Sequence, residues 1–405
     1  MRAPAHILVL TYWSLPDALI QAYTLPYLRI MRKHLPPGSR VSLLTLERPG
    51  SGSTTMNSSA SSLAAEGIEW IPGTYYPFGW RAIMHLPRLL FGLFRRIKKD
   101  RVSAIHCWAT PAGALGYFLS LLTGVQLVLD SYEPHAEAMV ENGTWRRNGL
   151  AFRILFALEK RQTRRASAII AANGGMKDYA SEKYGVILEG LLIKPACVDL
   201  ERFQPKPEKD ADLLRELGLE GRRVAVYAGK FGGIYLDREV FAFFKEAHQR
   251  WGDNFRALLL TNHSEKEIAE FCAGAQLDRS VVVTRFVAHA EVPRYLALAD
   301  FALTPVKPVP TKRYCTPIKD GEYWAMGLPV VIPPDISDDS AIIKRERLGA
   351  VWETLDSAGY RQSLDVLDEL LNVPREELQG KVRQLAIRYR SFSIADKVYA
   401  SVYGQ

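Results

Sequence analysis

The feature that most constrains the fold is a short apolar run that recurs along the chain, with helix-length segments between its copies. Parallel strands buried on both faces have this composition, because neither face of the strand meets water. The pattern therefore predicts doubly wound parallel sheets covered by helices on both sides. The predicted strands are 6–11, 41–46, 104–108, 126–130 and 168–172, and then 223–228, 256–261, 281–285, 301–304 and 329–332.

The strand pattern stops at a charged, proline-containing stretch, residues 199–222, and then begins again. At about 100–200 residues per domain, a chain of 405 residues is long enough for two domains. We expect an N-terminal Rossmann-like domain over 1–200, a C-terminal Rossmann-like domain over 201–385, and a helix over 386–405 that crosses back to the N-terminal domain. Open parallel sheets bind ligands at the carboxyl ends of their strands, so we expect the site in a central cleft that both domains face.

Composition and cysteine spacing exclude several classes of protein. No apolar run approaches the roughly 18 residues that span a bilayer. The four cysteines are far apart and form no CxxC pair, which favours reduced thiols in the cytoplasm and no zinc site. Asp210 and Asp212 have the spacing of a metal-binding pair, but they lie in the expected linker. We therefore predict a cytoplasmic protein without a bound metal.

The net charge of +8 is unevenly distributed. Residues 1–200 contain 23 Lys and Arg against 14 Asp and Glu, whereas residues 201–405 contain 29 against 30. Such an asymmetry usually marks a surface that meets an anionic partner. No helix-turn-helix, zinc or RNA-binding signature accompanies the charge, so we do not expect nucleic acid to be that partner.

The most informative stretch is YCTPIKDGEYWAMGLPVVIP, residues 314–333. It predicts a short helix between two strands, with Thr316 as its cap, Pro317 at the first helical position and Gly327 just past the end. The helix N-terminus offers backbone N–H groups to an anion such as pyrophosphate, and Lys319 adds a positive charge. Glu322 lies one turn later, where it could accept hydrogen bonds from ribose hydroxyls. A capped helix with a surface Lys–Glu pair is an equal alternative.

This stretch resembles the family 4 retaining glycosyltransferases, whose second domain carries an E-A-x-A-x-G-x-P-V-V segment. Residues 322–331 match that pattern closely. The resemblance extends upstream to a glycine-rich loop after a strand and to a segment that meets the nucleobase in the family. It covers about residues 224–335 and assigns as donor-binding residues Gly229, Lys230, Gly232, Gly233, Arg285, Val287, Thr316, Lys319 and Glu322.

The resemblance implies the GT-B fold and a hexosyltransferase-like enzyme that uses a nucleotide-diphosphate sugar as co-substrate, without another cofactor. The chain departs from the family at Tyr314, where a second glutamate is common. The family's second basic residue is also missing from 234–237, and Lys319 is expected to take its phosphate role. These departures leave the identity of the sugar open.

The N-terminal half supplies the candidates for catalysis and acceptor binding. The loop after the first predicted strand lacks the family's paired glycines, but Ser14 and Asp17 could hold an acceptor. The strand ending at Asp130 is followed by Glu133 and His135, which are placed for general-base or charge-stabilising work. A polar loop with a helix cap is an equal alternative. Retaining enzymes of this fold can act without a protein nucleophile, so one essential base need not exist.

Two segments carry most of the excess positive charge. From Arg81 to Arg101, and again over 145–165, basic residues recur every seven positions beside apolar residues. Each set forms a basic stripe along a helix, which favours docking on anionic lipid and a polyprenyl-linked acceptor. The alternative is two surface helices that pack on the first sheet. We expect Pro87 to kink or interrupt the first segment.

The leading hypothesis is a metal-independent retaining transferase that builds a surface polysaccharide or lipopolysaccharide from a glycan or lipid-linked acceptor. In that case the protein would lie peripherally on the inner face of the plasma membrane. A sugar-nucleotide epimerase of the same fold is a second hypothesis, although it would not need a basic, amphipathic first domain. A non-catalytic nucleotide-sugar-binding or scaffold protein is a third.

Overall fold

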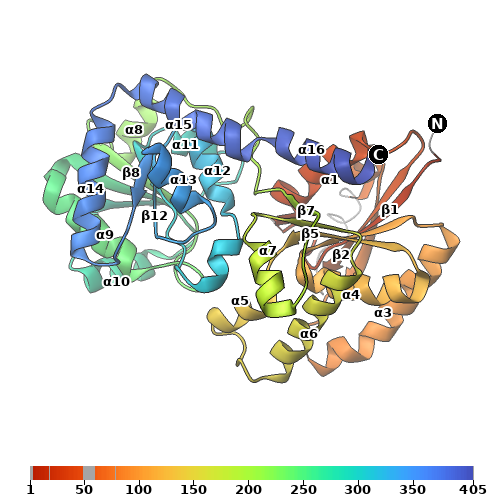
Figure 1. The fold of residues 1–405 in the computed structure, drawn as a ribbon. Helices are drawn as coiled ribbons and strands as arrows, with labels where there is room; N and C mark the ends of the chain where they lie inside the picture. Colours follow the sequence, from red (N-terminus) through yellow and green to blue (C-terminus); the bar gives the residue numbers. More distant parts are fainter. Residues whose placement is uncertain (1–2, 18, 49–59, 78, 405) are drawn as a thin grey trace. The chain divides into compact units, whose positions relative to one another are not determined.

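The computed structural model describes residues 3–17, 19–48, 60–77 and 79–404 (Figure 1). The chain forms two compact units. Unit 1 comprises Met1–Lys194 and Ser393–Gln405, and unit 2 comprises Pro195–Phe392. Each unit contains one sheet whose strands all pair in parallel, which confirms the predicted fold class.

The sheet of unit 1 has the strand order β3-β2-β1-β4-β5-β6-β7. The five strands predicted in this half are present. The prediction missed β3, which is mostly half-exposed and contains Pro72 and Gly73, and β7, which has only three residues. The strands are β1 (His6–Leu10), β2 (Arg40–Glu47), β3 (Ile68–Thr74), β4 (Ala104–Trp108), β5 (Gln126–Tyr132), β6 (Ala168–Ala171) and β7 (Leu191–Ile193).

Three helices of unit 1, α3, α4 and α6, contact one another in a row. Helix α3 runs continuously through Pro87, so the predicted interruption is wrong. Residues 83–88 are exposed, and the carbonyl group that loses its helical partner there meets solvent. The helices are α1 (Leu25–Lys33), α3 (Trp80–Lys99), α4 (Ala109–Thr123), α5 (His135–Glu141), α6 (Leu150–Arg165) and α7 (Met176–Tyr179).

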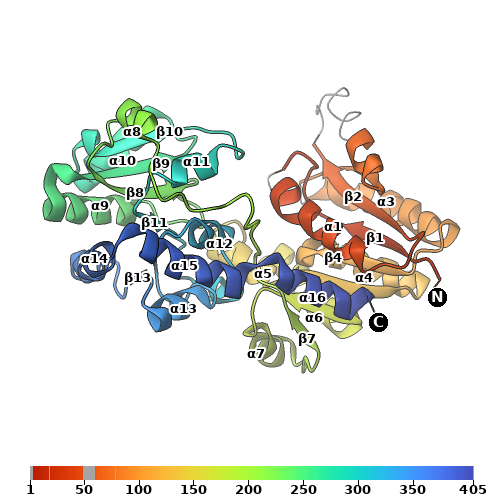
Figure 2. The same ribbon diagram turned by 90° about the horizontal axis from the view of Figure 1, so that it is seen from above.

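The C-terminal segment forms two helices, α15 (Arg375–Arg390) and α16 (Phe392–Tyr403), so the single helix expected over 386–405 is broken near its start. The break occurs because Ser391 is extended and the carbonyl of Arg390 accepts from the backbone N–H of Val198 at 2.8 Å. Helix α16 packs in unit 1 beside α1, as Figures 1 and 2 show, and His34, directly after α1, contacts Asp396 at 2.8 Å. The prediction that the C-terminal helix returns to the N-terminal domain is confirmed.

The sheet of unit 2 has the strand order β10-β9-β8-β11-β12-β13. Successive residues of β8 enter opposite cores, with Val224 and Val226 on one face and Ala225 and Tyr227 on the other. Five of these strands were predicted, and the three-residue β13 was missed. The strands are β8 (Arg223–Ala228), β9 (Phe255–Leu260), β10 (Val282–Arg285), β11 (Phe301–Leu303), β12 (Val330–Ile332) and β13 (Gly349–Val351).

Helices cover both faces of this second sheet. One core includes residues of α8, α11, α12, α13 and α15, and the other includes residues of α9, α10 and α14. The remaining bounds are α8 (Ala211–Leu217), α9 (Arg238–Trp251), α10 (Glu265–Ala275), α11 (Val292–Leu296), α12 (Ile318–Ala325), α13 (Asp339–Glu346) and α14 (Ser357–Leu371).

Candidate functional site

The candidate donor site lies at the carboxyl ends of β8 and β11, where the strand order of unit 2 reverses. Open α/β sheets bind ligands at such a switch point. The loop after β8 contains Gly229, Gly232 and Gly233, and the last two have left-handed φ values of 77° and 60°. The backbone of Lys230 in this loop is held by the Tyr227 hydroxyl, which donates to its carbonyl at 2.6 Å, while its side chain is exposed.

Helix α12 is anchored directly beside this loop. The hydroxyl of Tyr323 accepts from the backbone N–H of Ala228 at 3.0 Å, which ties the helix to the end of β8. The helix begins at Ile318 with Pro317 at the cap position, and no side chain caps it. The predicted cap at Thr316 is therefore wrong, because its hydroxyl lies 3.2 Å from that of Ser337. The predicted end at Gly327 is confirmed by a φ of 72° just beyond the last turn.

Lys319 and Gly229 lie in contact in this arrangement. A Cβ atom on Gly229 would come within 3.0 Å of the Lys319 Cε and 2.7 Å of the Tyr227 hydroxyl. The Lys319 ammonium donates to the Tyr235 hydroxyl at 3.2 Å and lies 4.7 Å from the centre of that ring. A glycine-rich loop, a lysine and a helix N-terminus therefore converge, which is a suitable arrangement for a diphosphate.

The side chain of Glu322 is held by a residue that sequence reasoning missed. Nε2 of His289 lies 3.4 Å from a carboxylate oxygen of Glu322. Its Nδ1 lies 2.9 Å from the Arg202 guanidinium, which can only donate, so Nδ1 accepts and Nε2 carries the proton. His289 thus donates toward Glu322 and fixes its orientation. No sequence motif marks His289. It lies in a loop, and its ring is oriented by Arg202, 87 positions earlier in the chain.

Arg285 is the last residue of β10 and Val287 follows that strand, and the two residues occupy different surroundings. The Arg285 guanidinium is 3.8 Å from the carboxylate of Glu216 on α8, and it donates to the Thr284 carbonyl at 3.0 Å. Val287 is half-buried against the core. The contacts of Arg285 are thus with α8 and its own strand, whereas Lys319, Gly229 and Glu322 come together around α12.

The switch point of unit 1 lies between β1 and β4, and the loop after β1 is well ordered by hydrogen bonds. The buried Glu47 carboxylate accepts from the backbone N–H of Leu15 at 2.9 Å. Asp17 accepts from the N–H of Leu19 at 2.8 Å, and its own N–H donates to the Ser14 carbonyl at 3.0 Å. Asp17 therefore starts the turn that leads toward α1, and Ser14 and Asp17 lie at opposite ends of one tight turn.

Asp130 is fully buried at the end of β5. One carboxylate oxygen lies 3.2 Å from the Lys194 ammonium, and the other accepts from the Tyr399 hydroxyl at 2.7 Å and contacts His106 at 3.2 Å. Burial alone would raise the pKa of Asp130, but Lys194 and these hydrogen bonds lower it to about 2. Asp130 was a candidate catalytic residue. In the structure its carboxylate is a charged group of the core.

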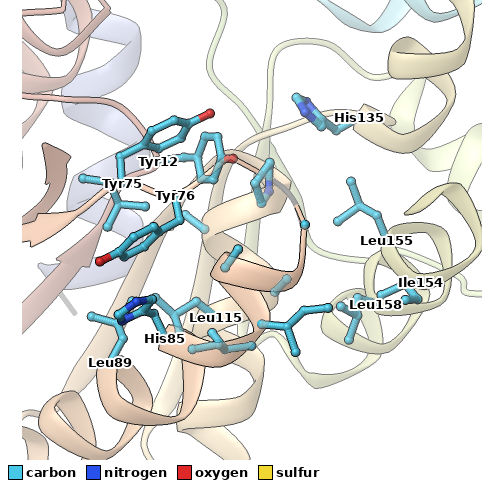
Figure 3. A pocket seen from close by; sticks show the side chains of 18 of the residues that line it. Tyr12, Tyr75, Tyr76, His85, Leu89, Leu115, His135, Ile154, Leu155 and Leu158 are labelled. Atoms are coloured by element: carbon cyan, nitrogen blue, oxygen red, sulfur yellow. The ribbon is translucent and has the colours of Figure 1, made fainter. Parts of the chain in front are cut away.

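Glu133 and His135 follow β5 and are partly exposed, with Nδ1 of His135 at 3.6 Å from the Glu133 carboxylate. His135 is the first residue of α5 and lines a cavity of about 1050 Å³ within unit 1 (Figure 3). The cavity also meets the loop after β1 through Thr11, Tyr12 and Trp13. It therefore lies at the switch point of unit 1, and His135 lies at its rim.

A buried carboxyl group that sequence reasoning also missed holds the start of α5. Glu159 on α6 accepts from the backbone N–H of Ala136 at 2.8 Å and from the Tyr184 hydroxyl at 3.0 Å. Its side chain is completely buried. Burial raises the pKa of Glu159 to about 8, against these hydrogen bonds. The start of α5 is therefore held by a buried acid whose pKa is raised by its burial.

This pKa predicts how the stability of the protein depends on pH. Folding raises the pKa of Glu159 from 4.5 to about 8. The contribution of this group to the free energy of unfolding is therefore fully present below pH 4.5 and is lost as the pH rises toward 8. Glutamine resembles the protonated acid and cannot ionise, so Glu159→Gln is expected to melt at a higher temperature than the wild type near pH 9 and at a similar one near pH 5. Thermal unfolding across this range checks the prediction, with the exposed Glu182→Gln as control. Parallel profiles for all three proteins would contradict it.

Comparison with known proteins identifies the class of the chain. Residues 21–188 match the family model described as Glycosyl transferase 4-like domain. The chain is a glycosyltransferase. The matched segment covers most of unit 1 and includes Glu133 and His135.

Solved structures support the GT-B fold over the whole glycosyltransferase chain. A glycosyltransferase from Rickettsia africae ESF-5 is 14% identical, with a TM-score of 0.68 and coverage of 99% of this chain and 98% of that one. Anabaena HepE in complex with UDP-glucose is 16% identical, with a TM-score of 0.70 and 98% of each chain covered. WaaG, involved in lipopolysaccharide biosynthesis, is 15% identical, with a TM-score of 0.69 and coverage of 99% and 100%. No curated protein matches the sequence.

Two features are absent from the described residues of the glycosyltransferase. Within these residues, no helix is both long and apolar enough to cross a bilayer. In the same part of the chain, no group of three or more His, Cys, Asp or Glu side chains is arranged to hold a metal ion.

Proposed function

We propose that the enzyme transfers a sugar from a nucleoside diphosphate donor bound by unit 2. The observation that carries this proposal is the convergence of Lys319, the Gly229 loop and Glu322 at the switch point of the second sheet. In the proposal the diphosphate contacts Lys319, Lys230 and the α12 N-terminus, and Glu322 accepts from the ribose hydroxyls. The UDP-glucose complex of HepE makes a UDP-sugar the first donor to test.

The proposed reaction retains the anomeric configuration and needs no metal ion. The bond between the anomeric carbon and the diphosphate oxygen breaks, a bond to the acceptor oxygen forms, and the acceptor proton passes to the departing diphosphate. Lys319 and backbone N–H groups stabilise the charge that develops on that diphosphate. Unit 1 supplies the acceptor site, where Ser14, Asp17, Glu133 and His135 orient the hydroxyl and Asp130 positions the end of β5 from the core.

The test measures donor binding and transfer in parallel. The purified protein is melted with UDP-, GDP- and CMP-sugars, because a ligand of the folded state raises the melting temperature by mass action. The proposal would be supported if one nucleotide class raises the melting temperature and the corresponding nucleoside diphosphate is released when a glycan or lipid-linked acceptor is added. A shift without turnover would favour the scaffold hypothesis, and no shift in folded protein would remove the donor site.

We further propose that unit 1 docks on an anionic membrane surface through α3. Arg81, Arg88 and Arg95 are exposed on this helix, and so are the apolar side chains of Trp80 and Phe91. The guanidinium groups of Arg81 and Arg95 lie 5.4 Å and 5.7 Å from the rings of Trp80 and Phe91. A basic face and an apolar face on one helix are typical of binding at a lipid interface.

The double substitution Arg81→Ala with Arg95→Ala tests this docking. Each basic residue near an anionic membrane contributes about 1 kcal/mol, so the affinity for phosphatidylserine vesicles is expected to fall about 10–30-fold. Co-sedimentation at low and high salt measures the change. Lys177→Ala with Lys183→Ala removes two exposed lysines from another part of unit 1 and is the matched control. Equal losses in both double variants would contradict a specific role for α3.

A further inference from the structure

The cavity of unit 1 has a lining that the proposed sugar chemistry does not explain. Its volume of about 1050 Å³ is at the upper end for ligand pockets. Most of its lining is aliphatic or aromatic and comes from α3, α4 and α6; examples are Leu89, Leu115, Phe118, Leu155 and Leu158. A sugar hydroxyl would leave its hydrogen bonds unmade against such walls, at a cost in free energy. The deep part of the cavity therefore fits a hydrocarbon.

Two polar side chains of the cavity, Tyr12 and His135, lie away from its aliphatic walls. In Figure 3 they lie toward one end of the view, whereas Leu115 and Leu158 lie toward the other, together with a third polar side chain, His85. Thr11 also belongs to the lining, directly after β1. A molecule that fills this cavity would thus have an apolar body among the helices and a polar group beside His135.

Exposed apolar side chains continue from the lining to the surface. Ile83 and Leu86 of α3 and Ile154 of α6 line the cavity and are also solvent-exposed, at 63%, 38% and 41%. Trp80 and Met84, each 70% exposed, extend this surface along α3. Arg88 lines the same cavity with an exposed side chain. These exposed apolar side chains, with the Arg88 guanidinium beside them, suit a lipid whose hydrocarbon chain ends in an anionic group.

We propose that this cavity binds the hydrocarbon chain of the acceptor, which we infer to be a glycan whose hydroxyl accepts the sugar and which is linked through a phosphate or diphosphate to a lipid that enters from the bilayer. The chain lies among α3, α4 and α6, and the head group lies at the end of the cavity that Tyr12 and His135 line. The inference rests on the proposed function, because it names the class of acceptor for the same transfer. Each methylene buried in the cavity strengthens binding about fourfold, so affinity increases steeply with chain length.

The first experiment compares hexadecyl phosphate with butyl phosphate, each titrated into the full-length protein below its aggregation concentration. We expect the long chain to bind at least about 100-fold more tightly. Ala114 lines the cavity from α4, and Ala114→Trp fills it, which is expected to weaken hexadecyl phosphate at least about tenfold. Leu122→Trp adds the same side chain to an exposed position of α4 outside the cavity and is expected to leave binding unchanged.

A second experiment does not depend on any variant. Hexadecyl phosphate with a photoreactive terminus is crosslinked to the wild-type protein, and the labelled residues are identified by mass spectrometry. Labels on Leu115, Phe118 or Leu158 would support the inference, because these residues line the cavity among the helices. Labels confined to Trp80 and Met84, or equal binding of the two phosphates, would overturn it.

Donor binding separates this inference from the proposed function. If the UDP-sugar raises the melting temperature of the wild type and of Ala114→Trp while neither binds the long-chain phosphate, the lipid acceptor is overturned and the transferase stands. If the long-chain phosphate binds in the cavity but no donor binds to folded protein, the proposed function fails, and the cavity's assignment as an acceptor site fails with it.

Discussion

Glu322→Gln is expected to weaken binding of the nucleotide-sugar donor about 10–100-fold, with a similar loss in kcat/KM. The carboxylate is proposed to accept hydrogen bonds from the ribose, and bonds to a charged group contribute about 1.5–3 kcal/mol. The amide keeps the shape of the side chain and still accepts from His289, which lies 3.4 Å away. The free protein should therefore melt near the wild-type temperature, and only the donor-induced shift should disappear.

The control for this variant is Glu270→Gln on α10, where the side chain is exposed and 3.9 Å from Lys266. Isothermal titration with the best donor measures both affinities directly. Wild-type donor affinity in Glu322→Gln would remove Glu322 from the binding site. His289→Ala extends the test, because loss of the group that orients Glu322 should weaken donor binding by a smaller factor.

Gly327→Ala is expected to have the largest effect on stability, lowering the melting temperature of unit 2 by about 5–15 °C. Gly327 has a φ of 72°, which costs a residue with a Cβ atom about 1–2 kcal/mol. The added Cβ would also lie 2.7 Å from both Cα and Cβ of Gln379, so α15 would have to shift. Overpacking of this kind adds about 1–3 kcal/mol.

Gly380→Ala is a matched control for Gly327→Ala. Gly380 lies inside α15, one residue from Gln379, and an added Cβ there would meet no atom within 4 Å. Alanine favours a helix over glycine by about 1 kcal/mol, so this variant should melt at the wild-type temperature or above it. Calorimetry of the three proteins gives the comparison. A small effect in both variants would show that the end of α12 is not tightly packed against α15.

The fold could be predicted from the sequence because buried parallel strands are nearly continuous apolar runs. Ten strands were found on that basis, whereas β3, β7 and β13 were not. β3 is half-exposed and contains Pro72, and the other two have only three residues each. Whether such segments form strands depends on the neighbouring strands of the folded sheet, and the local sequence pattern carries no information about those neighbours.

The candidate site was predictable only where its residues are close in sequence. Lys319, Glu322 and Gly327 belong to one helix and its end, so spacing alone connects them. His289 and Glu159 act through partners 33 and 23 positions away, and no periodicity links such pairs. Asp130 was a candidate because a predicted strand ends there, but its buried partners include Lys194 and Tyr399, which lie far along the chain.

The return of α16 to unit 1 has a consequence for how the protein is made. Tyr399, which donates to Asp130, is synthesised 269 residues after it. During translation, residues 1–194 emerge without this partner, and unit 2 is complete in sequence before α16 leaves the ribosome. The buried charge of Asp130 therefore lacks one of its hydrogen bonds until α16 has been made. Unit 1 should finish folding only after that point, and a version truncated before α16 should depend on chaperones.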